Sequence, residues 1–111
     1  MAQRVRRLIV LFRRRLKNMS EIKMNEFGLT LTGRPYGKDC YEKISRRGLI
    51  APYILNFKGV ISLGSSFGEE VIVPLSKIDS SELFISSANP AIKNCLEKIK
   101  TDFDLKLSFR E

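Results

Sequence analysis

One stretch, residues 53–70, constrains the fold more than any other part of the chain. It begins with an apolar run, turns at Lys58-Gly59, passes through a loop of small residues and enters a segment with helical spacing of apolar positions. A short apolar run bounded by turn residues is typical of a buried strand, and Pro52 suits the position just before one. The stretch therefore predicts a buried strand connected by a loop to the start of a helix, with Phe57 and Val60 in the core.

The start of this helix carries a capping signature. Ser66 is followed three residues later by Glu69, the spacing at which the hydroxyl accepts from an early helical N–H and the carboxylate reaches back to the cap residue. Helix N-termini carry free N–H donors that attract anions or a partner's acceptor groups. Pro74 predicts a short or bent helix.

The rest of the chain alternates strand and helix signals. A strand or hairpin is expected within residues 22–32, where Phe27, Leu29 and Leu31 alternate with polar residues, and a turn at 33–37. Further strands are expected at 82–87 and 104–109, and helices at 38–47, 67–77 and from Asn89-Pro90 onward, where Asn is a good N-cap and Pro a good first helical residue. This pattern predicts an α/β domain with helices packed on a sheet.

Several motifs resemble a family of small bacterial STAS-like domains. The central resemblance lies in residues 56–60, with the sequence Asn-Phe-Lys-Gly-Val, and in 62–70, with Ser-Leu-Gly-Ser-Ser-Phe-Gly-Glu-Glu. Residues 27–37 and 88–92 are similar to the family's opening and to its entry into the last helix. The resemblance covers roughly residues 23–101. It implies a mixed sheet of about four to five strands with about three helices mainly on one face.

The same resemblance implies a regulatory, non-enzymatic role in bacterial signalling. In the related anti-sigma-factor antagonists, a serine at this strand-to-helix turn is phosphorylated by a kinase-like ATPase, which abolishes a protein–protein contact. Ser65 falls at that position, although Gly64 stands where the antagonists usually have Asp and Phe67 where they have Gly. The alternative is that Ser65 is a solvated loop residue. The candidate docking and phosphorylation residues are Ser62, Ser65, Ser66, Phe67 and Glu70.

Two charged features of the candidate site region each have a simple alternative explanation. Arg34, in the family-like Gly-Arg-x-x-Gly segment, is either a contact for an anion or an acidic partner or a solvated turn residue. Glu69 and Glu70 are neighbours on a helix, so their side chains diverge by roughly 100°, and we expect them not to converge on one substrate. Glu69 is expected to complete the capping box and Glu70 to face solvent or a partner.

Composition limits the chemistry available to the chain. The sequence has no histidine and only two cysteines, Cys40 and Cys95, which excludes His-dependent catalysis and zinc sites that need imidazole. Isolated cysteines suit a reducing, cytoplasmic compartment. There is also no glycine-rich phosphate loop followed by Lys, so a nucleotide-binding domain is the weakest alternative. We expect no enzyme activity, no cofactor and no metal.

The net charge of +8 is concentrated at the N-terminus. Residues 1–18 contain seven basic groups and no acidic one; removing those seven from the chain's 20 lysines and arginines leaves 13 against 12 acidic residues. Residues 1–18 are expected to be a basic amphipathic extension and 19–111 the STAS-like domain. The extension is a non-native or unstructured leader, a packed first helix, or an anchor for nucleic acid or a membrane surface.

Overall fold

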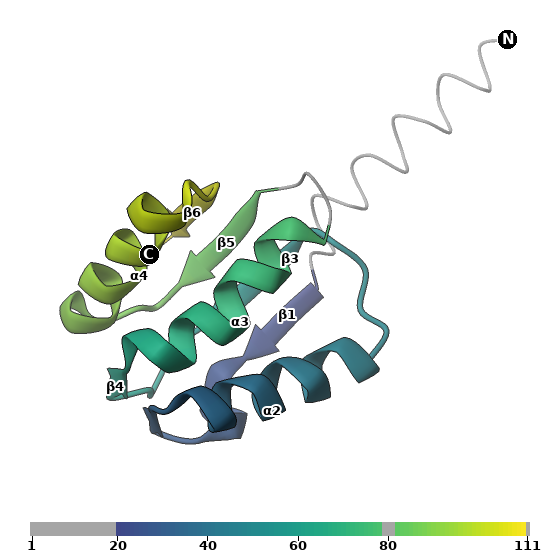
Figure 1. Cartoon of the computed structure of the whole chain (residues 1–111), viewed down its shortest axis with the longest axis horizontal. Helices are drawn as coiled ribbons and strands as arrows, with labels where there is room; N and C mark the ends of the chain where they lie inside the picture. The colour runs from purple at the N-terminus through teal and green to yellow at the C-terminus, as the bar shows by residue number, and fades with distance from the viewer. Residues whose placement is uncertain (1–19, 79–81, 111) are drawn as a thin grey trace, which may run out of the picture.

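The computed structural model describes residues 20–78 and 82–110 (Figure 1). Expectations about the extension, residues 1–18, lie outside this part of the chain and stay predictions. The described residues form an α/β domain with three helices, which confirms the predicted fold class.

The central layer is a four-stranded sheet in the order β1-β3-β5-β6. Every strand pairing in it is parallel, where the resemblance had implied a mixed sheet. The apolar runs at 53–57 and 83–86 become neighbouring inner strands, as expected for buried strands of a parallel sheet. The bounds are Ser20–Lys23 for β1, Tyr53–Asn56 for β3, Leu83–Ser86 for β5 and Leu107–Arg110 for β6.

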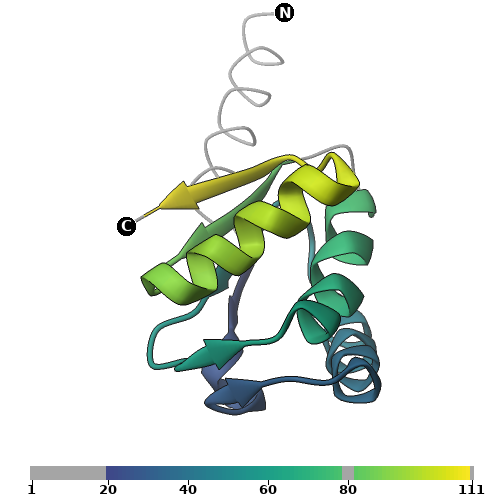
Figure 2. The ribbon, with the colours of Figure 1, turned by 60° about the vertical axis from the view of Figure 1, so that its left-hand side comes forward.

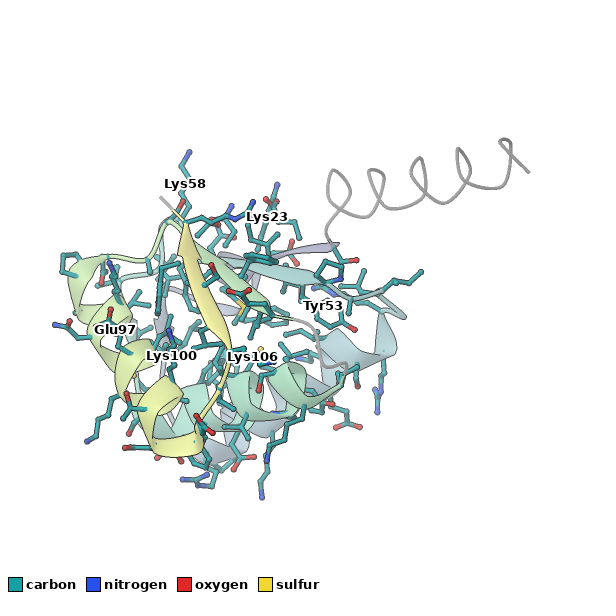
Figure 3. All side chains as sticks on the ribbon, turned by 90° about the horizontal axis from the view of Figure 1, so that it is seen from above. Lys23, Tyr53, Lys58, Glu97, Lys100 and Lys106 are labelled. Atoms are coloured by element: carbon teal, nitrogen blue, oxygen red, sulfur yellow. The ribbon has the colours of Figure 1, made fainter. Side chains whose placement is uncertain are left out.

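Three helices cover a single face of this sheet (Figure 3). They are α2, Arg34–Arg46; α3, Ser65–Lys77; and α4, Pro90–Phe103. The strand order never reverses along the sheet. Because crossovers between parallel strands are almost always right-handed, a sheet that grows in one direction receives all its helices on the same side. Within residues 20–78 and 82–110 the fold is therefore a two-layer sandwich whose second sheet face carries no helix.

The core lies between the sheet and the helices. Alternate residues of β3 and β5 point into it, so Tyr53, Leu55 and Ile85 are buried. Phe57 and Val60 are 1% and 4% exposed, which confirms both as core residues. The helices contribute the apolar residues at their helical spacing, among them Cys40, Ile44, Phe67, Val71, Leu75, Ile92 and Leu96.

The segment predicted as one strand or hairpin at 22–32 is divided into three short elements. β1 ends at Lys23, the 3-10 helix η1 spans Met24–Phe27, and β2 contains only Thr30–Leu31. β2 pairs in parallel with β4, Ser62–Leu63. Gly28 separates η1 from β2 at φ 138°, a backbone conformation that L side chains rarely adopt. Leu31 is buried but Leu29 is exposed, so the alternation did not describe one continuous strand.

Two helix boundaries also differ from the sequence-based expectation. Residues 33–37 are not a turn, because α2 already begins at Arg34, with Pro35 in its first turn where the missing N–H costs nothing. α2 ends before Gly48, which adopts φ 63° as predicted for a helix-terminating glycine. α3 is not cut short at Pro74 but continues for three more residues.

Candidate functional site

The N-terminus of α3 is the centre of the predicted site, and its cap is not the predicted one. The helix begins at Ser65 with Gly64 as its N-cap residue, and no side chain bonds to the cap position. The Ser66–Glu69 capping box is therefore wrong. A Cβ at Gly64 would lie 3.2 Å from Thr32 Cγ2, so the residue that follows β2 packs closely against the turn that starts the helix. This close approach fixes Ser65 at an exposed position on the first turn of α3.

Arg34 binds both glutamates of α3. Its Nη1 donates to Glu70 Oε1 at 2.6 Å and its Nη2 to Glu69 Oε2 at 3.1 Å. Glu70 first and Glu69 second raise the pKa of the Arg34 guanidinium by accepting these hydrogen bonds. The expectation that the two carboxylates share no target is wrong, because the planar guanidinium fork spans two diverging side chains. Arg34 is therefore a bridge between α2 and α3; its side chain is 48% exposed, but it lies in a helix and not in a turn.

The two helices approach closely enough for this bridge at Gly37. A Cβ there would lie 2.8 Å from the Phe67 carbonyl oxygen and 2.9 Å from Glu70 Cβ. One residue earlier, the ring of Tyr36 meets that of Phe67 edge to face, with centroids 5.2 Å apart. Phe67 itself is fully buried. Phe67 is therefore a core residue that anchors α3, and it is not available to contact a partner as predicted.

Two exposed apolar side chains that the sequence did not single out lie just before β2 and β4, the strand pair next to the start of α3. Leu29 and Ile61 are 53% and 64% exposed, and they are neighbours because Ile61 N donates to Leu29 O at 2.8 Å. Ser62, the first residue of β4, comes directly after Ile61 and is partly exposed. We call Leu29, Ile61, Ser62 and Ser65 the β2–β4 surface; β4 lies beside the start of α3 in Figure 2. Sequence alternation placed Leu29 with the buried Leu31, so no local signal marked it as exposed.

Asn89 holds the β2–β4 surface in place from the opposite side. Its Oδ1 accepts from Ile92 N at 2.8 Å, which confirms Asn89 as the N-cap of α4. Its Nδ2 donates to Ile61 O at 2.9 Å. One side chain therefore joins the start of α4 to the loop before β4, so the surface rests on fixed backbone.

The two cysteines of the chain are in environments that make them unreactive. Burial raises the pKa of the Cys40 thiol to about 12 and also raises that of Cys95, so both stay protonated at neutral pH and are poor nucleophiles. Both are free cysteines. Within the part of the chain that the structure describes, no group of three or more His, Cys, Asp or Glu could hold a metal ion. Among the same residues, no helix has the length and apolar character needed to cross a membrane.

The comparisons with known proteins add no relatives. No family model matches the chain, and neither does any curated protein or solved structure.

Proposed function

We propose that this protein is a non-enzymatic, STAS-like regulatory module that docks on a signalling partner through the β2–β4 surface. The observation that carries the proposal is the position of Leu29 and Ile61. Adjacent exposed apolar side chains that form a continuous patch mark protein contact sites. They lie beside the loop that leads to the exposed Ser65, the residue at which the resemblance implies phosphorylation.

The arrangement around Ser65 supports a charge-sensitive contact. A phosphate on Ser65 would lie at the N-terminus of α3, where the helix dipole favours negative charge. The fold itself would tolerate the modification. A partner that packs on Leu29 and Ile61 would meet a dianion next to its apolar contact, and the desolvation of that charge would oppose binding. Phosphorylation would then release the partner without unfolding the domain.

The class of partner follows from the resemblance. We propose a histidine-kinase-like ATPase, because that is the enzyme that modifies the matching serine in the antagonists that this chain resembles, and we place the complex in the cytoplasm. The ion pairs of Glu69 and Glu70 with Arg34 are intramolecular. We therefore assign Glu70 to positioning α3 and not to the partner contact.

Calorimetric titration of the full chain against such an ATPase from the same host tests the proposal. Ser65→Asp should weaken binding by tenfold or more, about 1.4 kcal/mol, with little change in melting temperature. Ser65→Asn is the matched control for size without charge and should bind nearly as well as the wild type. The double variant Leu29→Ser/Ile61→Ser should also weaken binding, and it should fold because both side chains are exposed.

Equal affinities for the wild type, Ser65→Asp and the double variant would remove the β2–β4 surface from the interface. A loss of binding with Ser65→Asn as large as that with Ser65→Asp would show that size, not charge, matters at this position, and would refute regulation by phosphorylation.

A further inference from the structure

The sheet face opposite the helices carries two rows of side chains in register. Alternation along each strand places every second residue on this open face, and these residues are the partly or fully exposed ones. The strand pairings align them across all four strands. The row at the carboxyl ends contains Lys23, Asn56, Ser86 and Arg110. The row behind it contains Glu21, Ile54, Phe84 and Ser108.

Each member of the first row, which we call the carboxyl row, can donate hydrogen bonds. Lys58 joins it from the turn after β3, where its N–H donates to Asn56 Oδ1 at 2.9 Å. This bond uses the acceptor of the Asn56 side chain and leaves its amide donors. Figure 3 shows Lys23 and Lys58 on the side of the sheet away from the helices. The ion pairs found among the described residues involve none of Lys23, Lys58 and Arg110.

A hollow lies at the β1–β3 end of the carboxyl row. A cavity of about 490 Å³ is lined by Lys23, Asn25, Asn56, Lys58 and Gly59 and contains no acidic residue. A second cavity, of about 590 Å³, includes Arg110 but is otherwise lined largely by α4 and the helix-facing side of the sheet, for example by Lys93, Glu97 and Phe109, and so belongs to the helix side. Positive charge therefore lies at both ends of the row, with Lys23 and Lys58 at one end and Arg110 at the other.

An aromatic platform lies directly behind the row. The Arg110 guanidinium carbon is 4.4 Å from the centre of the Phe84 ring, and both side chains belong to the open face. Aromatic rings and arginine planes are the groups on which proteins stack unpaired nucleic-acid bases. Ile54 lies next to Phe84 in the same row and extends the apolar platform.

We propose that the open sheet face binds single-stranded nucleic acid along the carboxyl row. Lys23, Lys58 and Arg110 contact phosphates, and a base stacks on the Phe84–Arg110 pair. Four strands separated by about 4.8 Å give the row a length of about 14 Å. One phosphate ion cannot bridge this length, whereas successive nucleotides of a strand can.

Charge complementarity selects a polyanion over the chain's own N-terminal segment. The chain's own N-terminal segment has seven basic groups and no acidic group, so the basic row would repel it. The same segment would instead add affinity for a polyanion. The proposed face is opposite the helix layer that contains Ser65, so the inference does not rest on the protein-docking proposal.

Fluorescence anisotropy with labelled ten-residue oligouridylate and oligothymidylate tests the inference on the full chain. One triple variant removes the charges of the row: Lys23→Gln/Lys58→Gln/Arg110→Gln. It should weaken binding about tenfold or more at roughly 0.1 M salt. The slope of log K against log salt should become less negative by about 2, as expected for the loss of three phosphate contacts. Lys38→Gln/Lys77→Gln/Lys98→Gln removes the same charge from exposed positions, one on each helix, and is the matched control. It should weaken binding less than threefold.

A second variant tests stacking separately from charge. Phe84→Leu retains an apolar side chain on the open face and should weaken binding about fivefold or more with no change in salt slope. Comparison of the two oligonucleotides shows whether the ligand is RNA, DNA or either. Equal losses for the two triple variants would overturn the proposal. Displacement of the oligonucleotide by polyglutamate of equal length, or by equimolar inorganic phosphate, would also overturn it.

Discussion

Two glycines lie inside helices at close contacts with other elements, Gly37 in α2 and Gly68 in α3. Of these, we expect Gly37 to lose more stability when it is replaced by alanine. In a helix interior, Gly→Ala normally stabilises by about 1 kcal/mol. At Gly37 the new Cβ would lie 2.8 Å from the Phe67 carbonyl oxygen, 2.9 Å from Glu70 Cβ and 3.0 Å from Phe67 Cα. Two of these atoms are backbone, so the helices themselves must separate, by roughly half an ångström.

The expected result is a net loss of stability. Overpacking of this kind typically costs about 1–3 kcal/mol, and separation of α2 from α3 also weakens the Tyr36–Phe67 contact and the Arg34 bridge. After the gain in helix propensity, we expect Gly37→Ala to destabilise the domain by about 1–2 kcal/mol. For a domain of this size that loss lowers the melting temperature by about 4–15 °C.

Gly68→Ala is the matched control in the neighbouring helix. Its Cβ would meet the tip of the Ile99 side chain at 2.7 Å, which is shorter than the Gly37 contacts but can be relieved by rotation of a flexible group. Urea unfolding of both variants, followed by circular dichroism, should rank Gly37→Ala as clearly less stable than Gly68→Ala. If Gly37→Ala is as stable as the wild type, or more stable than Gly68→Ala, backbone proximity does not set the α2–α3 spacing.

Two further predictions concern caps and titration. Asn89→Ala should lower the free energy of unfolding by about 1–2 kcal/mol, because the variant loses the α4 cap and the hydrogen bond to Ile61 O. Ser66→Ala should change it by no more than about 0.5 kcal/mol. Equal unfolding free energies of the two variants in urea titrations would contradict this prediction. Burial raises the pKa of Cys40 from 9.0 to about 12, so the unfolded thiol loses its proton first and stability falls between pH 9 and 12. Cys40→Ala should show a shallower decline in thermal melts across this range, and identical pH profiles would refute the role of Cys40.

Features governed by local sequence could be predicted. The apolar run before Lys58-Gly59, the Asn89-Pro90 helix start and the terminating Gly48 each depend on residues close to one another in sequence, and each occurs as expected. The α/β architecture follows from their alternation. Phe57 and Val60 are buried for the same reason.

Features that depend on contacts between distant residues could not be predicted. Glu69 could bond either to the cap position three residues earlier or to Arg34, which is 35 residues away in the sequence. Only the close approach of α2 and α3 at Gly37 decides between these two partners. The motif predicted that Phe67 contacts a partner at the surface, but Phe67 is buried in the core and packs against Tyr36. The carboxyl row depends on strand register, which one-residue slips would destroy.

In the four-stranded sheet the order of the strands in space is the same as their order in the sequence. This has a consequence for how the chain can fold during synthesis. The strands enter the sheet in the order in which the ribosome releases them, from β1 through β3 and β5 to β6. Each new strand can therefore add to the free edge left by the previous one, and its helix can dock beside the helix already in place. Chains emerge at about 5–20 residues per second, so successive strands of this domain appear seconds apart. No strand has to be inserted between two partners that have already paired, and partly synthesised chains can therefore keep all the pairings they have made.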